Sequence, residues 1–229
     1  MATLYLSDIR SLDYSVNYDR AFSLLSDGRK KKMALYKNSE ARKQILVSEL
    51  LLRKALDDKK IDHEDLVYEY NEYGKPSLSN INGFFFNISH SGDYVLLGAS
   101  DNEIGVDIER IKKFNPRIAQ RFFRKEEYEY IMTPQDEEKR RRLFFLYWVI
   151  KESFIKYSGK GLSQALNSFR IDIDENDRIT VYQEEKRSEL YFRHFNDLDG
   201  YSIGSCTHEE DVELKMISFA ELMKEGVLL

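Results

Sequence analysis

The stretch Ile104-Gly105-Val106-Asp107-Ile108-Glu109 carries the pattern on which the predicted fold and site depend. Apolar and polar side chains alternate along it, which predicts a strand with one buried face. Asp107 and Glu109 therefore leave the same face of the strand, about 7 Å apart, and Gly105 leaves open space on that face. Two carboxylates in this arrangement could hold a hard cation, or they could simply be solvated at the edge of a sheet.

The composition limits the class of protein. A length of 229 residues with 42% hydrophobic side chains is enough for one large domain or two of roughly 110 residues. Charged residues make up 33% of the chain, but the net charge is only −5, so we expect no nucleic-acid partner. The single cysteine, Cys206, fits a cytoplasmic protein. Residues 1–10 do not resemble a signal peptide, and no apolar run approaches the roughly 18 residues of a membrane span.

Positive charge gathers in the first part of the chain. Arg29 and Lys32 precede a helix expected over residues 39–56, with Ser39 as a possible cap. The first turns of this helix hold Arg42 and Lys43, where the helix dipole disfavours cations. The charge could be a solvated surface or a patch for an anionic ligand.

Two loops present further polar side chains. Gly74-Lys75-Pro76 predicts a tight loop with one projecting ammonium group. Residues 89–93 predict a hairpin connection between two strands, with His90 at the end of the first. A single histidine in such a place is more often structural or solvated than functional.

The longest helix is expected over residues 133–157. Trp148, Glu152 and Lys156 follow one another at i, i+4 and i+8 and share a face. A Glu–Lys pair alone would indicate a surface ion pair, but an exposed Trp beside it predicts that this face contacts something. Lys151, about 100° round the helix from Glu152, is expected at the rim of the domain. The main apolar stripe comprises Leu143, Leu146, Tyr147, Ile150, Phe154 and Tyr157.

We expect an α+β fold made of two similar halves. Residues 94–100 resemble residues 201–207, and each stretch follows a turn. The chain after residue 169 reads mostly as strands. The halves, residues 1–103 and 104–229, would each pack a small, mostly antiparallel sheet on a long helix. They would form one body, with the active site in the cleft between them.

The combined side chains indicate phosphate chemistry. Magnesium takes one or two carboxylates together with substrate phosphates and waters, and lysine and histidine suit the phosphates. The acids, lysines and histidine named above therefore suggest a pyrophosphate-cleaving transferase, which works by positioning and charge neutralisation. The sequence contains no P-loop, no dinucleotide-binding glycine motif and no cysteine–histidine cluster with zinc spacing.

Four motifs occur in an order that resembles the Sfp-type 4′-phosphopantetheinyl transferases. They are Gly74-Lys75-Pro76, Phe86-Asn87-Ile88-Ser89-His90-Ser91, residues 104–109 and Trp148-Val149-Ile150-Lys151-Glu152-Ser153-Phe154-Ile155-Lys156. The resemblance spans about residues 20–165. It implies a monomer of two repeats that transfers the phosphopantetheine arm of coenzyme A to a serine of an acyl or peptidyl carrier protein. The second product would be adenosine 3′,5′-bisphosphate.

The resemblance also implies roles for particular residues. Asp107, Glu109 and Glu152 would bind Mg²⁺, and Asp107, Glu152 and Lys156 would be the catalytic residues. Either Glu152 or a metal-bound water that it orients could take the serine proton, and Lys156 could neutralise or protonate the leaving phosphate. The coenzyme A contacts would be Lys75, Pro76, Ser89, His90, Arg29, Lys32, Arg42 and Lys43.

Two other functions are compatible with these side chains. One is a binding module that holds coenzyme A or a carrier protein without turnover, although the presence of all three acids argues against it. The other is a magnesium-dependent nuclease or nucleotide hydrolase. The sequence does not distinguish carriers of nonribosomal peptide, polyketide or fatty-acid synthesis.

Overall fold

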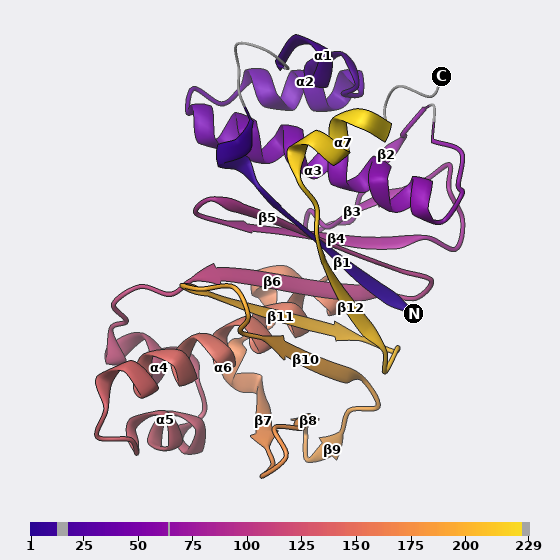
Figure 1. The fold of residues 1–229 in the computed structure, drawn as a ribbon. Helices are drawn as coiled ribbons and strands as arrows, with labels where there is room; N and C mark the ends of the chain where they lie inside the picture. The colour runs from indigo at the N-terminus through magenta and orange to yellow at the C-terminus, as the bar shows by residue number, and fades with distance from the viewer. Residues whose placement is uncertain (13–17, 64, 226–229) are drawn as a thin grey trace.

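The computed structural model of the protein describes residues 1–12, 18–63 and 65–225 and has a mixed α+β fold (Figure 1). The first part of the chain forms β1 (Ala2–Asp8), the 3-10 turn η1 (Ile9–Ser11), α1 (Tyr18–Ser23), α2 (Asp27–Ala34), α3 (Ser39–Asp58), β2 (Tyr68–Tyr70), β3 (Pro76–Leu78), β4 (Phe85–Ser91) and β5 (Tyr94–Ser100). The second part forms β6 (Ile104–Arg110), α4 (Pro116–Phe122), α5 (Lys125–Met132), α6 (Glu137–Ser158), the 3-10 turns η2 (Gly161–Ser163) and η3 (Leu166–Ser168), β7 (Phe169–Ile173), β8 (Ile179–Gln183), β9 (Lys186–Arg187), β10 (Tyr191–Phe195), β11 (Tyr201–Thr207), β12 (Val212–Met216) and α7 (Phe219–Glu225). The strand and the long helix that carry the predicted acids are present as β6 and α6.

The first sheet has the strand order β12-β1-β5-β4, with α3 packed against it (Figure 1). β5 pairs antiparallel with β1 and β4, whereas β1 and β12 run parallel. α3 begins after Asn38, whose side chain accepts a hydrogen bond from the Glu40 N–H, so Asn38 is the cap and not Ser39. The apolar side chains of α3, such as Leu46 and Leu50, are buried in the core on this side of the sheet.

The second sheet, β10-β11-β6, is antiparallel throughout and lies against α6. Two glycines allow this close contact. A Cβ atom at Gly105 would lie 2.0 Å from the carbonyl oxygen of Ser153, and one at Gly204 would lie 2.7 Å from the carbonyl oxygen of Val149. A side chain at either position would push α6 away from the sheet, so the space expected above Gly105 is filled by the helix.

Apolar side chains fill the space between the two sheets. β4 and β5 of the first sheet contact β6 of the second, which places the two sheets next to each other along the middle of the molecule (Figure 1). The buried side chains there come from both sheets and include Leu4, Leu6, Leu96, Ile104, Val106, Ile108 and Ile203. β6 is therefore covered on both faces, and its alternating sequence pattern places Asp107 on the α6 side.

The last segment of the chain returns to the first sheet. β12 pairs with β1, and α7 contacts α3. Ile217, Phe219, Leu222 and Met223 are buried in the same core as α3. This segment follows residue 104 in the chain, yet it packs on the first sheet and on α3. The physical reason is that β1 has an open edge and α3 has an apolar surface, and this segment covers both.

The remaining elements surround α6. α4 and α5 lie beside α6, and the small sheet β7-β8-β9 lies next to α5, where the Ile171 N–H of β7 donates to Glu127 Oε1 of α5 (Figure 1). Phe144, Ile150, Phe154 and Phe169 belong to the core that these elements share. Within the described parts of the chain, none of the helices combines the length and the apolar character that crossing a membrane requires.

Candidate active site

Asp107 lies at the centre of the predicted site residues. It is 4% exposed, and its Oδ1 atom accepts hydrogen bonds from Ser89 Oγ at 2.8 Å and from Lys156 Nζ at 2.7 Å. Lys156 Nζ also donates to Ser89 Oγ at 2.8 Å. The other carboxylate oxygen, Oδ2, is buried and has no hydrogen-bond partner. Three elements, β4, β6 and α6, therefore meet at one carboxylate that still has a free acceptor atom.

Alternate side chains of β4 fasten that strand to β6. In each case a side-chain oxygen of β4 accepts a backbone N–H of β6: Asn87 from Val106 at 2.9 Å, Ser89 from Ile108 at 3.3 Å and Ser91 from Arg110 at 3.1 Å. Two of the same hydroxyl groups donate to the acids, because Ser89 binds Asp107 and Ser91 Oγ binds Glu109 Oε2 at 2.8 Å. The Asn-x-Ser-x-Ser pattern thus satisfies backbone groups and orients both carboxylates of β6.

Glu109 and Glu152 share the electrostatic field of Asp107. Burial raises the pKa of Glu109, and repulsion by Asp107 raises it further. Burial raises the pKa of Glu152 to about 7, with repulsion from Asp107 as the next cause, while the nearby Lys156 partly opposes the shift. Both shifts therefore arise mainly from removal of the carboxylates from water and secondly from repulsion between them.

The acids fit a divalent cation although they do not form a closed metal site. Among residues 1–12, 18–63 and 65–225, no group of three or more His, Cys, Asp or Glu side chains is already arranged to hold a metal ion. The buried, unpartnered Oδ2 of Asp107 and the raised pKa values of Glu109 and Glu152 both indicate negative charge that lacks a partner. A hard cation with oxygen ligands would supply that partner.

His90 lies within electrostatic range of the lysines Lys156 and Lys32. Partial shielding from water lowers the pKa of His90, and the Lys156 ammonium lowers it further by repelling the charged ring. Lys32 adds a smaller repulsion, which shows that α2 is close enough to affect the imidazole electrostatically. The lysines of α2 and α6 therefore act on the same histidine of β4, which favours its neutral form.

Arg29 is not a surface cation. It is 6% exposed, its Nε atom binds Glu49 Oε2 at 3.2 Å, and its guanidinium lies 4.7 Å from the ring centroid of Tyr68. Its Nη2 atom is buried without a hydrogen-bond partner. The ammonium of Lys32 lies 5.8 Å from the ring centroid of Tyr70, and burial together with repulsion by Arg29 lowers the pKa of Lys32.

The other predicted coenzyme A contacts lie on α3 and at the start of β3. Arg42 Nε donates to the carbonyl oxygen of Tyr36 at 2.7 Å, which ties the start of α3 to the preceding loop. Lys43 is half-buried on the same helix, and Pro76 is half-buried as the first residue of β3. These contacts leave Arg42 with further donors on its guanidinium.

The ammonium of Lys75 does not project from its loop as the sequence suggested. Its Nζ atom lies 2.6 Å from Glu103 Oε2 and 3.1 Å from the carbonyl oxygen of Tyr157, at the end of α6. Asn71 holds the loop in this position, since its Oδ1 accepts from the Lys75 N–H and its Nδ2 donates to the carbonyl oxygen of Gly159. Free carbonyl groups at a helix C-terminus attract cations, which explains where the ammonium lies.

Sequence comparisons identify the family. A model described as the 4′-phosphopantetheinyl transferase superfamily matches residues 103–206, and one described as 4′-phosphopantetheinyl transferase, N-terminal, matches residues 14–102. The chain is 31% identical over 208 residues to the 4′-phosphopantetheinyl transferase Sfp of Bacillus subtilis (strain 168), covering 90% of this chain and 92% of that relative. It is 33% identical over 186 residues to the 4′-phosphopantetheinyl transferase gsp of Aneurinibacillus migulanus, covering 81% and 77% of the two chains.

The chain belongs to the 4′-phosphopantetheinyl transferase superfamily. It is an enzyme of that class, as the resemblance of its motifs implied. A solved structure, the holo-[acyl-carrier-protein] synthase of Thermotoga maritima, has a TM-score of 0.39 and 16% identity, covering 48% of this chain and 64% of that one. A likeness of this size supports no conclusion about fold or function.

In this transferase the environment of two α6 side chains, Trp148 and Lys151, differs from the one that the sequence predicted. Trp148 is half-buried, with ring centroids of Phe122, Phe123 and Phe144 between 5.7 and 6.4 Å away, so it is part of the packing between α4 and α6. Lys151, expected at the rim, is fully buried. Side chains on several faces of α6 are buried because the helix is surrounded by the second sheet, α5 and β7.

Two polar groups near the site of the transferase were missed in the sequence analysis. Ser91 carries a signal that could have revealed it, because it lies two residues after Ser89 on the same strand and so on the same face. Glu127, which binds Lys151, carries no such signal, since the two residues lie on different helices.

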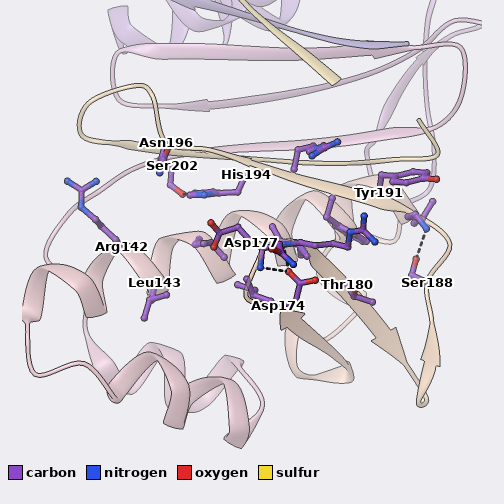
Figure 2. Close-up of a pocket in the computed structure, with 18 of the residues that line it drawn as sticks. Arg142, Leu143, Asp174, Asp177, Thr180, Ser188, Tyr191, His194, Asn196 and Ser202 are labelled. Carbon is purple, nitrogen blue, oxygen red and sulfur yellow. Dashed lines mark hydrogen bonds between the residues drawn. The ribbon is translucent and has the colours of Figure 1, made fainter. Parts of the chain in front are cut away.

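A cavity of about 1510 Å³ lies in the second half of the transferase, between α6, β10 and the β7–β8 hairpin (Figure 2). None of the predicted site residues lines it. Leu143 and His194 face it from α6 and β10, and His194 Nε2 is 2.8 Å from Ser202 Oγ. The acids and the cavity are therefore separate features of this structure.

Proposed function

We propose that this protein transfers the 4′-phosphopantetheine arm of coenzyme A to a serine of an acyl or peptidyl carrier protein, with Mg²⁺ as the required metal. Adenosine 3′,5′-bisphosphate would be the other product. The observation that carries the proposal is the Asp107 carboxylate, which binds Lys156 and Ser89 through one oxygen and leaves the other free in a buried place. Such a carboxylate could hold a metal ion against a pyrophosphate.

Asp107, Glu109 and Glu152 would hold the Mg²⁺ ion. When bound, the ion would neutralise charge on the pyrophosphate of coenzyme A. Ser89 and Ser91 would keep the two carboxylates of β6 in position through their hydroxyl groups. The oxygen-only donor set of Asp107, Glu109 and Glu152 supports magnesium in preference to a softer metal.

Glu152 would act on the proton of the attacking serine, and Lys156 would act on the charge of the leaving phosphate. The pKa of about 7 belongs to Glu152 without a bound cation, and a Mg²⁺ ion beside it would lower that pKa and keep the carboxylate ionised, as a general base at neutral pH must be. Glu152 would take the serine proton either directly or through a water that it orients. Lys156 Nζ would turn from Asp107 toward the leaving phosphate and stabilise its charge.

Coenzyme A would bind along α2, α3 and β4. Arg29 belongs to the proposed contact set, and its buried Nη2 atom, which lacks a hydrogen-bond partner, would reach a phosphate oxygen after a movement of the side chain. Lys32 is close enough to His90 to lower the pKa of the imidazole. Both residues belong to the proposed contact set, together with Ser89, Arg42 and Lys43. Lys75 and Pro76 would contribute through their loop, with the Lys75 ammonium either remaining at α6 or moving to the ligand.

The architecture proposed from the sequence is a pair of repeats, residues 1–103 and 104–229, packed as one body with the site between them. β5 and β11, which carry the similar sequences, are each the central strand of an antiparallel triplet, and this supports the proposal. We further propose that the protein is a cytoplasmic monomer with no nucleic-acid or membrane partner. Carriers of nonribosomal peptide, polyketide and fatty-acid synthesis remain the candidate substrates.

Mass spectrometry of a panel of apo-carrier proteins, incubated with the enzyme, coenzyme A and Mg²⁺, tests the proposal. We expect a mass gain of one phosphopantetheine group on at least one carrier, abolished by excess chelator and restored by added Mg²⁺. The matched control replaces the carrier serine with alanine. Release of adenosine 3′,5′-bisphosphate without any modified carrier would instead indicate a hydrolase, and binding of coenzyme A without either product would indicate a binding module.

A further inference from the structure

Lys151 and Glu127 form an ion pair that is removed from water almost completely. Lys151 is 0% exposed and Glu127 is 2% exposed, and Nζ lies 2.9 Å from Oε2. Lys151 is on α6, directly before Glu152, and Glu127 is on α5. The ammonium also lies 4.4 Å from the ring centroid of Phe169 and 5.7 Å from that of Phe123, so aromatic rings flank it.

Every strong hydrogen-bonding position of this pair is used. The three donors of the Lys151 ammonium meet Glu127, the carbonyl oxygen of Leu166 at 2.8 Å and that of Phe169 at 3.0 Å. Glu127 Oε1 accepts from the Ile171 N–H at 2.8 Å, and Oε2 accepts from the Arg124 N–H at 2.9 Å. The pair joins α6 to α5, η3 and β7, and fixed backbone groups hold both of its charges.

We propose that the Glu127–Lys151 pair is a positioning device that fixes the rotation of α6 about its own axis. The inference rests on the roles proposed above for Glu152 and Lys156, which lie on another face of the same helix. With side chains about 5–6 Å from the axis, a rotation of about 20° would move the Glu152 carboxylate by about 2 Å. Displacements of about 1 Å can cost about 10²-fold in rate, so this rotation has to be held closely.

Stability alone is a weak reason for such a pair. Removing two charges from water costs about as much as their attraction returns, and apolar residues of similar size are often equally stabilising. α6 already packs on the sheet through Gly105 and Gly204, which sets its distance from β6 and β11. Apolar contacts tolerate small rotations, whereas an ammonium with three fixed acceptors does not. The pair therefore supplies the angular restraint that packing lacks.

The test compares Lys151→Met and Glu127→Gln with Arg142→Met. Arg142 lies near the start of α6 in an exposed ion pair with Glu138 and is the matched control. For each variant kcat, KM for coenzyme A and the Mg²⁺ concentration for half-maximal activity are measured well below its Tm. We expect kcat to fall about 10²-fold in Lys151→Met, with a higher Mg²⁺ requirement and little change in KM, and no change in Arg142→Met.

Glu127→Gln keeps an oxygen for the Ile171 N–H group but places an NH₂ group, a donor, opposite the Arg124 N–H and the Lys151 ammonium. It removes the negative charge with almost no change in side-chain volume, so it tests the proposal if Lys151→Met does not fold. The single tryptophan, Trp148, provides a readout besides activity, because a rotated α6 would change its contacts and shift its fluorescence emission. Wild-type kcat and Mg²⁺ requirement in both folded variants would overturn the proposal. If Glu152→Gln and Lys156→Ala also kept wild-type kcat, the assigned site itself would be wrong.

Discussion

Asp107 has two hydrogen-bond donors on one carboxylate oxygen and none on the other. A buried oxygen without a partner is costly to a fold, so its presence in the middle of a well-packed molecule indicates a functional requirement. Lys156 donates to the oxygen that has partners. Replacing Lys156 therefore distinguishes a structural role of this contact from a role in catalysis.

We predict that Lys156→Ala lowers kcat by about 10²-fold, similar to the loss of one preorganised donor in other enzymes. The affinity for coenzyme A should fall less, because the proposed interaction strengthens as charge develops during transfer. Steady-state kinetics with one carrier at saturating coenzyme A measures this. Lys160→Ala, at an exposed position just beyond α6, is the control. An unchanged kcat in Lys156→Ala would mean that this lysine only stabilises the position of Asp107 and takes no part in the transfer.

His194 gives a prediction about pH. Burial lowers its pKa to about 4, whereas the unfolded chain should titrate near the ordinary value of about 6.5. Between these values the unfolded state binds more protons, so the free energy of unfolding contributed by His194 is complete above pH 6.5 and is lost as the pH falls toward 4.

Urea unfolding at pH 7.5 and pH 5 tests this prediction. His194→Gln should lose less stability between the two pH values than the wild type does. His208→Gln, which removes an exposed histidine, should keep the wild-type difference. An identical difference in wild type and His194→Gln would mean that the ring is already accessible to protons in the folded state.

At the scale of elements, the site depends on how β4, β6 and α6 meet. The side chains of β4 bind backbone groups of β6 and its acids at once, and α6 reaches the sheet only because two glycines make room. Each contact is formed by residues far apart in sequence, so the motif Asn87-x-Ser89-x-Ser91 does not by itself show that its side chains bind backbone groups of β6.

We predict that Gly105→Ala destabilises the protein by at least about 1–3 kcal/mol, the usual cost of overpacking. The new Cβ would lie 2.0 Å from a backbone oxygen and 2.3 Å from a backbone nitrogen of α6, neither of which can move independently of the helix. Gly28→Ala is the control, because nothing lies within 4 Å of its added Cβ in α2. It should stabilise by about 0.5–1 kcal/mol. Equal denaturant midpoints for the two variants would contradict the described contact between α6 and β6.

At the scale of the whole molecule, the chain does not separate into two independent halves. β12 and α7 come from the end of the sequence and complete the first sheet and its core. Burial of this segment therefore stabilises the part of the protein that lies before residue 104.

We predict that Phe219→Ala lowers the stability of the whole protein by about 3–5 kcal/mol, as for other large core residues. Phe219 is 4% exposed within the core around α3. Met216→Ala, three residues earlier and 54% exposed, should change stability by less than about 0.5 kcal/mol. Urea unfolding followed by far-UV circular dichroism measures both. A small effect of Phe219→Ala would mean that this segment is not part of the first core.

The sequence by itself determined the elements and the family. Alternation identified β6, helical spacing identified α3 and α6, and four ordered motifs pointed to the transferases, because period and motif order are properties of the chain alone. Tertiary structure decided which charges face the site: it buried Arg29 against Glu49, turned Lys75 to the end of α6 and enclosed Lys151 beside Glu127. Those outcomes depend on partners distant in sequence, and the cost of burying a charge is known only when its partner and its distance from water are known.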